Sequence, residues 1–316
     1  MISRRLFNTG IFSASAFFSS AHAKTLTQTA TSLDSDAVGR GFSLLAQTGS
    51  MPAELHQWLS DPVIQKIAPY QVFDNVWYVG LRWVASYLIK TEEGYILIDT
   101  LHEPFVGHLI DNLSSLHIEL ENIKYVLMTH GHFDHVGGAA TLKPLLRNAH
   151  FVMSAKGWQE AQPGSKNHAT ARRMIPKDMT AKDGDIISLG KTRIKAIETP
   201  GHTWGTLSYQ YPVFCDGNRY EAVTIGGLCL NAIESDAQLK AYIASLEKLA
   251  AIQPQISVDM TAHPFSNHLT EKIELIKSRK KGESHPLVNR NGFIQQLAAL
   301  KKNAQLMLQK RQKKNS

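Results

Sequence analysis

The side chains best suited to chemistry gather in one short segment. His130, His132, Asp134 and His135 lie within six residues of one another. They directly follow the apolar run 123–128, which has the length and composition of a buried strand. We therefore expect the cluster in the loop that leaves the carboxyl end of that strand. Neutral imidazole and carboxylate are the ligands that zinc prefers in hydrolytic sites, so the segment indicates a zinc centre.

Two later histidines also follow strand-like runs. His202 comes after the run 192–197, and Pro200-Gly201 favours a turn that presents the histidine at the end of the strand. His263 follows a second such run, residues 256–262. The sequence thus offers ligands at three strand ends.

A His-x-His-x-Asp-His motif after a strand is the signature of the metallo-β-lactamase superfamily, and the chain resembles its members over roughly residues 70–300. The resemblance implies an α/β fold, the αββα sandwich, in which two sheets face each other with helices outside. It also implies two Zn²⁺ ions along one edge. On the pattern of the family, one zinc is held by His130, His132 and His202, and the other by Asp134, His135 and His263.

The ligand set narrows the resemblance to a subclass. Glyoxalase-like and lactonase-like members carry a metal-bridging Asp at a strand end, whereas the corresponding run 222–231 has no acid at that place. Flavin-dependent relatives have Glu where His132 stands. With these relatives excluded, the ligand set of the chain resembles that of the class B lactamases of subclass B3, whose second zinc is bound by Asp, His and His.

One competing assignment concerns Cys229. Another lactamase subclass uses Asp, Cys and His at the second zinc, with the cysteine directly after a small pair. Here Leu228 separates Gly226-Gly227 from Cys229, and one residue of offset in an extended segment turns the side chain to the opposite face. The other interpretation of Cys229 is a small buried hydrophobe.

The function implied is a metallo-hydrolase that opens β-lactam rings. A metal-bound hydroxide, oriented by Asp134 as the catalytic residue, would attack the amide carbonyl. Asn231, Arg82 and Trp83 are candidates for binding the small-molecule substrate, although Gly227 stands where the subclass often has a serine. The alternative is a lactone or other ester hydrolase, because the same hydroxide attacks any reachable carbonyl. A non-catalytic metal-binding relative is a third possibility, against which the complete set of six ligands argues.

Two further residues are candidates for supporting the ligands. Asp99 closes the strand-like run 95–98, and a carboxylate there would fix the tautomer of a ligating imidazole. The competing interpretation of Asp99 is a strand-end cap. His102 follows closely and is expected near the site.

The amino-terminal residues differ from the rest. Residues 1–23 combine Arg4-Arg5, a diluted apolar stretch and a small-x-small end, as in a secretory signal peptide of the twin-arginine type. We therefore expect a periplasmic or secreted protein. Residues 24–69 are expected to form an arm, loose over 24–50 and with short helical pieces over 52–69.

The rest of the chain, residues 70–316, is expected to be one metallo-β-lactamase domain. Hydrophobic patterning predicts the opening strands over residues 72–79, 85–89 and 95–98. It predicts helices over residues 105–116 and 237–252 and a C-terminal helix over 293–308.

Composition limits the partners. The chain has 316 residues and a formal charge of +7, and its late basic runs are typical of solvated faces or tails. No run after the amino terminus is long and apolar enough to span a membrane, and a nucleic-acid partner is not expected. The only cysteines, Cys215 and Cys229, do not by themselves imply a disulfide. The sequence leaves the oligomeric state open.

Overall fold

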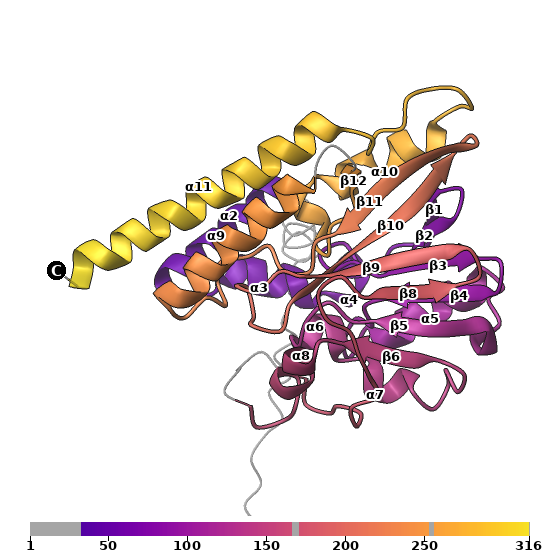
Figure 1. The fold of residues 1–316 in the computed structure, drawn as a ribbon, viewed down its shortest axis with the longest axis horizontal. Helices are drawn as coiled ribbons and strands as arrows, with labels where there is room; N and C mark the ends of the chain where they lie inside the picture. The colour runs from indigo at the N-terminus through magenta and orange to yellow at the C-terminus, as the bar shows by residue number, and fades with distance from the viewer. Residues whose placement is uncertain (1–32, 166–170, 253–255, 316) are drawn as a thin grey trace, which may run out of the picture.

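Two β-sheets face each other and carry helices on their outer sides (Figure 1). The structure, a computed structural model, describes residues 33–165, 171–252 and 256–315. The expected signal peptide lies outside the described residues, as does the start of the arm. Two facing sheets between outer helices are the layers of the predicted αββα sandwich, which is thereby confirmed.

The first sheet is antiparallel in its first half and parallel in its second. Its strands lie in chain order: β1 (Tyr70–Phe73), β2 (Val76–Tyr78), β3 (Tyr87–Thr91), β4 (Gly94–Ile98), β5 (Ile123–Leu127), β6 (His150–Met153) and β7 (Met179–Thr180).

The second sheet is antiparallel except where its last strand pairs. Its spatial order is β12 (Ile256–Asp259), β11 (Asn218–Thr224), β10 (Leu207–Cys215), β9 (Thr192–Glu198) and β8 (Ile186–Leu189). Because β12 joins this sheet through a parallel pairing, its carboxyl end lies beside that of β11.

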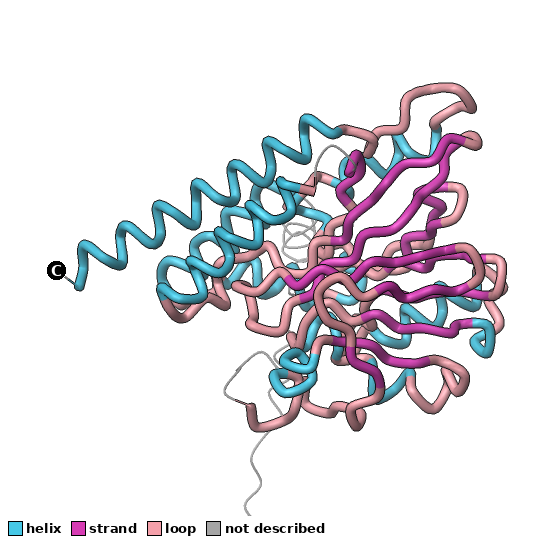
Figure 2. Tube along the Cα trace, viewed as in Figure 1, coloured by secondary structure: helices cyan, strands magenta, loops and turns pink. Residues whose placement is uncertain are grey.

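Three apolar layers hold the sandwich together. The central layer joins the facing sides of the two sheets and includes Ile96 and Tyr209, both fully buried. An outer layer packs Leu109 and Leu113 of α5 (Val106–Ser115) against the first sheet. The opposite layer packs α9 (Asp236–Ala251) and α11 (Arg290–Asn315) on the second sheet, and Figure 2 shows these two helices side by side.

Short helices complete the chain between these elements. They are α3 (Ala53–Ser60), α4 (Pro62–Gln65), η1 (Leu120–Asn122), α6 (Phe133–Val136), α7 (Ala139–Leu142), α8 (Ala155–Glu160), η2 (Pro264–Ser266) and α10 (Leu269–Ser278). Among the described residues, no helix is both long and apolar enough to cross a membrane.

The arm is more ordered than its composition predicts. Residues expected to be loose form α2 (Ser35–Thr48), so that part of the prediction is wrong. The carboxylate of Asp34 accepts a hydrogen bond from the N–H of Ala37 and caps the helix. Gly49, at a φ of 71°, ends it in the left-handed conformation that glycine adopts without strain. Val38 anchors α2 in the core, with 1% of its surface exposed.

Most of the other predicted elements are present. The single strand expected over 72–79 is instead the hairpin β1–β2, because Asp74 and Asn75 form a turn within it. The helices predicted over 105–116 and 237–252 are α5 and α9, and α3 and α4 are the expected helical pieces of the arm. Helix α11 runs beyond the predicted 293–308 at both ends.

Asp259, the last residue of β12, is a buried acid away from the ligand motif. Burial raises its pKa to about 7 from 3.8, against the opposing effect of nearby Lys272. The folded protein therefore holds this proton more tightly than the unfolded chain does. The resulting stability is fully present below pH 3.8 and is lost as the pH rises through about 7.

We expect Asp259→Asn to remove this loss. The variant should gain stability over the parent as the pH rises, with a difference in unfolding free energy on the order of a few kcal/mol at pH 8. Denaturant unfolding of both proteins at several pH values between about 4 and 8 measures the difference. Asp111→Asn, on the exposed side of α5, is the matched control. A difference for Asp259→Asn that does not change with pH would contradict the assignment.

Candidate metal centre

Loops at the carboxyl ends of three strands converge at one edge of the sandwich. The loop after β5 carries His130 and His132, and α6, which follows at once, carries Asp134 and His135. His202 lies in the turn after β9, and His263 follows β12. These are the six residues in which the sequence predicts metal ligands. The fold brings them together as two groups of three, each able to hold a metal ion.

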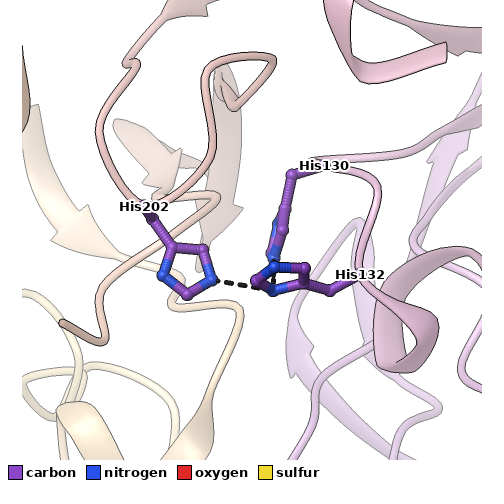
Figure 3. A group of neighbouring side chains, drawn as sticks. All are labelled: His130, His132 and His202. Atoms are coloured by element: carbon purple, nitrogen blue, oxygen red, sulfur yellow. Dashed lines mark hydrogen bonds between the residues drawn. The ribbon is translucent and has the colours of Figure 1, made fainter. Parts of the chain in front are cut away.

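The first group consists of three buried imidazoles from two loops. His132 Nδ1 lies 3.1 Å from His130 Nε2 and 3.0 Å from His202 Nε2, and Figure 3 shows the three rings converging. In a tetrahedral zinc site with Zn–N bonds of about 2.0–2.1 Å, neighbouring ligand atoms are about 3.3 Å apart. The observed spacing therefore suits one zinc ion at the point where the rings converge.

The second group combines a carboxylate with two imidazoles. Asp134 Oδ2 lies 3.0 Å from His135 Nε2 and 3.7 Å from His263 Nε2. All the ligand atoms of this group lie within 4.8 Å of one another. The two groups adjoin, since the rings of His130 and His135 are 4.2 Å apart between centroids. A substrate at this edge can therefore meet both.

Outer hydrogen bonds set the orientation of three of the imidazoles. His202 Nδ1 donates to the carbonyl of Cys229 at 2.6 Å, and His263 Nδ1 donates to the carbonyl of Trp83 at 2.9 Å. A carbonyl oxygen only accepts, so each Nδ1 carries the proton and each Nε2 presents its lone pair to the group. His135 Nδ1 bonds Asp99 Oδ2 at 2.7 Å, which confirms the supporting role predicted for Asp99.

The electrostatics of the cluster suit cation binding. Burial, reinforced by neighbouring imidazoles, holds the pKa of His130 and of His132 well below the usual range. Burial is also the largest influence on His202 and His263, lowering the pKa of each to about 4. These four imidazoles are therefore neutral near pH 7, the form in which histidine binds a metal.

Asp134 and His135 form a charged pair at the second group. Burial opposes ionisation of Asp134, but the adjacent imidazoles of His135 and His263 outweigh it and lower the pKa of the carboxyl. Burial likewise opposes protonation of His135, but Asp134 and Asp99 outweigh it and raise the pKa of His135 to about 10. A cation bound at this group takes the place of the proton between His135 and Asp134.

A cavity of about 1130 Å³ opens onto both groups. Trp83 and Asn231, two of the predicted substrate contacts, line it. Arg82 is not among the described lining residues, and its Nε donates to the carbonyl of Ile64 at 2.8 Å. We therefore do not retain Arg82 as a substrate contact. The guanidinium satisfies a carbonyl of helix α4 instead.

Part of this cavity was not predicted from the sequence. Phe42 of α2 and Leu59 of α3 contribute apolar wall, as does Phe133 of α6. His102, expected only near the site, is also part of the lining. The capping residues of α2 were a signal that this segment would be ordered, but no local pattern places it over the metal centre.

Cys229 contributes a backbone carbonyl to the site, and Gly227 leaves space for the side chain of His202. Cys229 belongs to neither ligand group, and the carbonyl of this residue, rather than the sulfur, supports His202. Its thiol and that of Cys215 are both free. A Cβ at Gly227 would lie 2.5 Å from the Cβ of His202, so His202 occupies the space where a serine side chain would stand.

Comparison with known proteins agrees with this geometry. The model of the Metallo-beta-lactamase superfamily matches residues 79–213. The chain thus contains a domain of this superfamily of metallo-hydrolases, as its histidine motif predicted.

Solved structures of subclass B3 lactamases are similar to the chain over most of its length. BJP-1, a subclass B3 metallo-β-lactamase of Bradyrhizobium japonicum, is 27% identical with a TM-score of 0.71, and the match covers 80% of this chain and 98% of that one. FEZ-1, a metallo-β-lactamase from Legionella gormanii, is 24% identical with a TM-score of 0.71, over 80% of this chain and 99% of that one. At 24% identity, the similarity to FEZ-1 shows the fold alone.

Curated relatives carry a different name. A hydroxyacylglutathione hydrolase of Maricaulis maris is 30% identical over 145 residues, which are 46% of this chain and 50% of that protein. One from Cereibacter sphaeroides is 29% identical over 140 residues, 43% of this chain and 47% of that protein. The chain spans about half the length of these relatives.

Substitutions at His135 and Cys229 test the assignment of the second group. We expect His135→Ala to release one of two bound metal ions, because it removes a ligand and leaves Asp134 with one imidazole. Cys229→Ala should retain both ions, since the carbonyl that supports His202 is kept. Elemental analysis after dialysis against metal-free buffer measures the content. Loss of metal from Cys229→Ala, with full retention by His135→Ala, would reverse the assignment.

Proposed function

We propose that the chain is a zinc-dependent β-lactamase that is exported to the periplasm or secreted. In this proposal His130, His132 and His202 hold one zinc ion, and Asp134, His135 and His263 hold the other. Two bound zinc ions would supply a nucleophile made from water near neutral pH and would polarise the β-lactam carbonyl. The similarity to BJP-1, a subclass B3 metallo-β-lactamase, supports the choice of substrate.

The composition of the second group carries the proposal. It contains one carboxylate and two imidazoles, and neither group includes a further acid among the described residues. The strand end where glyoxalase-like relatives carry a bridging Asp is formed here by Gly226 and Gly227, and His202 fills the space beside Gly227. An acidic side chain therefore has no room at this position. The pattern favours the lactamase arrangement over the glyoxalase one.

The residues around the two groups would orient and shield the substrate. Asp134, held ionised by its imidazole neighbours, supplies the only negative charge within the two ligand groups. Trp83 and Phe133 present aromatic surface beside it, which limits access of bulk water to the reacting carbonyl. Asn231 is exposed on the cavity lining, where its amide can bond a polar group of the substrate.

A second candidate function is hydrolysis of a lactone, thioester or other ester. The hydroxyacylglutathione hydrolases that the chain resembles favour it, because their name denotes a thioester substrate. The absence of an acid from the Gly226-Gly227 strand end argues against it. Both functions use the same two groups, so assays on different substrates separate them.

We expect the zinc-loaded protein to hydrolyse at least one of a penicillin, a cephalosporin and a carbapenem. A chelator should abolish the reaction and added zinc should restore it. Asp134→Asn should lower kcat/KM by at least about 100-fold, because even outer partners of metal ligands contribute about 10–100-fold. Asp111→Asn, at an exposed position of α5 that does not line the cavity, is the matched control.

The same preparation should be assayed with an N-acyl-homoserine lactone and a hydroxyacylglutathione thioester. Turnover of either one without turnover of any β-lactam would overturn the proposal in favour of the second function.

A further inference from the structure

The last helix carries a charge equal to that of the whole chain. Residues 290–315, the span of α11, include seven lysines and arginines and no aspartate or glutamate. The formal net charge of the 316 residues is also +7. The acidic and basic residues outside α11 therefore balance one another. The excess positive charge of the protein lies on a single helix, where it creates a local positive potential.

The inner face of α11 is occupied by its packing on α9. Ala304 is fully buried in the apolar layer that the two helices share. Lys301 forms an ion pair with Glu247 of α9 at 2.7 Å. The guanidinium of Arg311 donates to the carbonyl of Ile233, shortly before α9 begins. These contacts fix which side of α11 faces away from the protein.

The outer face of α11 presents lysines on either side of an apolar side chain. Lys302, Leu306 and Lys310 follow one another at intervals of four residues, so they lie along one side of the helix. Both lysines are exposed, and 46% of the surface of Leu306 is exposed. In the part of the chain that the structure describes, neither lysine has an ion-pair partner. The stripe is therefore an unneutralised cationic surface with an apolar centre.

The position of α11 leaves this stripe accessible. Figures 1 and 2 show the carboxyl end of the helix running past α9 and away from the two sheets. Of the described residues that line the cavity at the metal centre, none belongs to α11. A partner that contacts the outer face of α11 therefore does not have to displace any residue of the cavity wall.

We propose that the outer face of α11, formed by Lys302, Leu306 and Lys310, docks the protein on a membrane surface rich in anionic phospholipid. The ammonium groups pair with phosphate headgroups, while the leucine side chain and the lysine stems contact the upper part of the acyl chains. An exposed leucine between lysines favours lipid over nucleic acid, whose phosphate backbone is bound chiefly through charge. The proposed export also places the chain beside a phospholipid leaflet.

Co-sedimentation with lipid vesicles tests this docking surface on the zinc-loaded protein in its exported form. Vesicles of equal parts phosphatidylglycerol and phosphatidylcholine carry the anionic headgroup, and vesicles of phosphatidylcholine alone are the neutral comparison. We expect binding to the anionic vesicles only. The binding should weaken as the salt concentration rises, because salt screens exposed charges.

Replacing both lysines, Lys302→Gln with Lys310→Gln, should weaken binding to the anionic vesicles by at least about 10-fold, because each basic residue near such a surface contributes about 5-fold. Leu306→Ser should weaken it by about 2–5-fold, since apolar contact with the acyl chains is lost. Lys90→Gln with Lys195→Gln is the matched control, because it removes two exposed charges from strands of the sheets. None of these side chains lines the cavity, so hydrolysis should persist in every variant.

An equal loss of binding in the two double variants would overturn the proposal, because net charge alone would then explain the binding. Failure of the parent protein to bind anionic vesicles would also overturn it, and binding of duplex DNA through the same two lysines would then favour nucleic acid as the partner. Hydrolysis of β-lactams is assayed without vesicles, so the docking surface and the proposed function fail independently.

Discussion

The carboxylate of Asp99 fixes the geometry on which the metal centre depends. It follows β4 and accepts hydrogen bonds from the N–H and the hydroxyl of Thr129 and from His135 Nδ1. One buried side chain thereby ties the end of β4, the loop after β5 and helix α6 together. Thr100 strengthens the tie, since its N–H and hydroxyl both donate to the carbonyl of His135. Together these bonds hold the segments that carry His130 and His135 against the end of β4.

The ligands from the second sheet are also oriented by hydrogen bonds to groups outside the two ligand groups. His202 and His263 come from the second sheet, yet each is oriented by a main-chain carbonyl of a different loop. The packing of the two sheets sets the distances between the ligand atoms. The two carbonyls fix the tautomers of His202 and His263. Burial then keeps most of the imidazoles neutral, so the folded chain presents lone pairs rather than protons to a cation. Binding of metal and folding of these loops should therefore be coupled.

The grouping of the six candidate ligands was predictable because each follows a strand-like run and the motif is dense. The supporting role of Asp99 was predictable for the same reason, as it ends a strand beside the motif. The cavity wall was not predictable, because Phe42 reaches it from a helix more than eighty residues before the motif. The hydrogen bond from Arg82 to Ile64 was not predictable either, because sequence proximity to Trp83 does not show where the Arg82 side chain turns. Local patterns define elements and strand ends, whereas which remote segment covers a site depends on tertiary packing.

The two groups of three residues provide two separate metal positions. Anomalous diffraction at the zinc edge, from crystals of the zinc-loaded protein, locates the ions directly. We expect one peak among His130, His132 and His202 and a second among Asp134, His135 and His263. A single peak, or a second peak bonded to the sulfur of Cys229, would contradict the assignment of two metal positions.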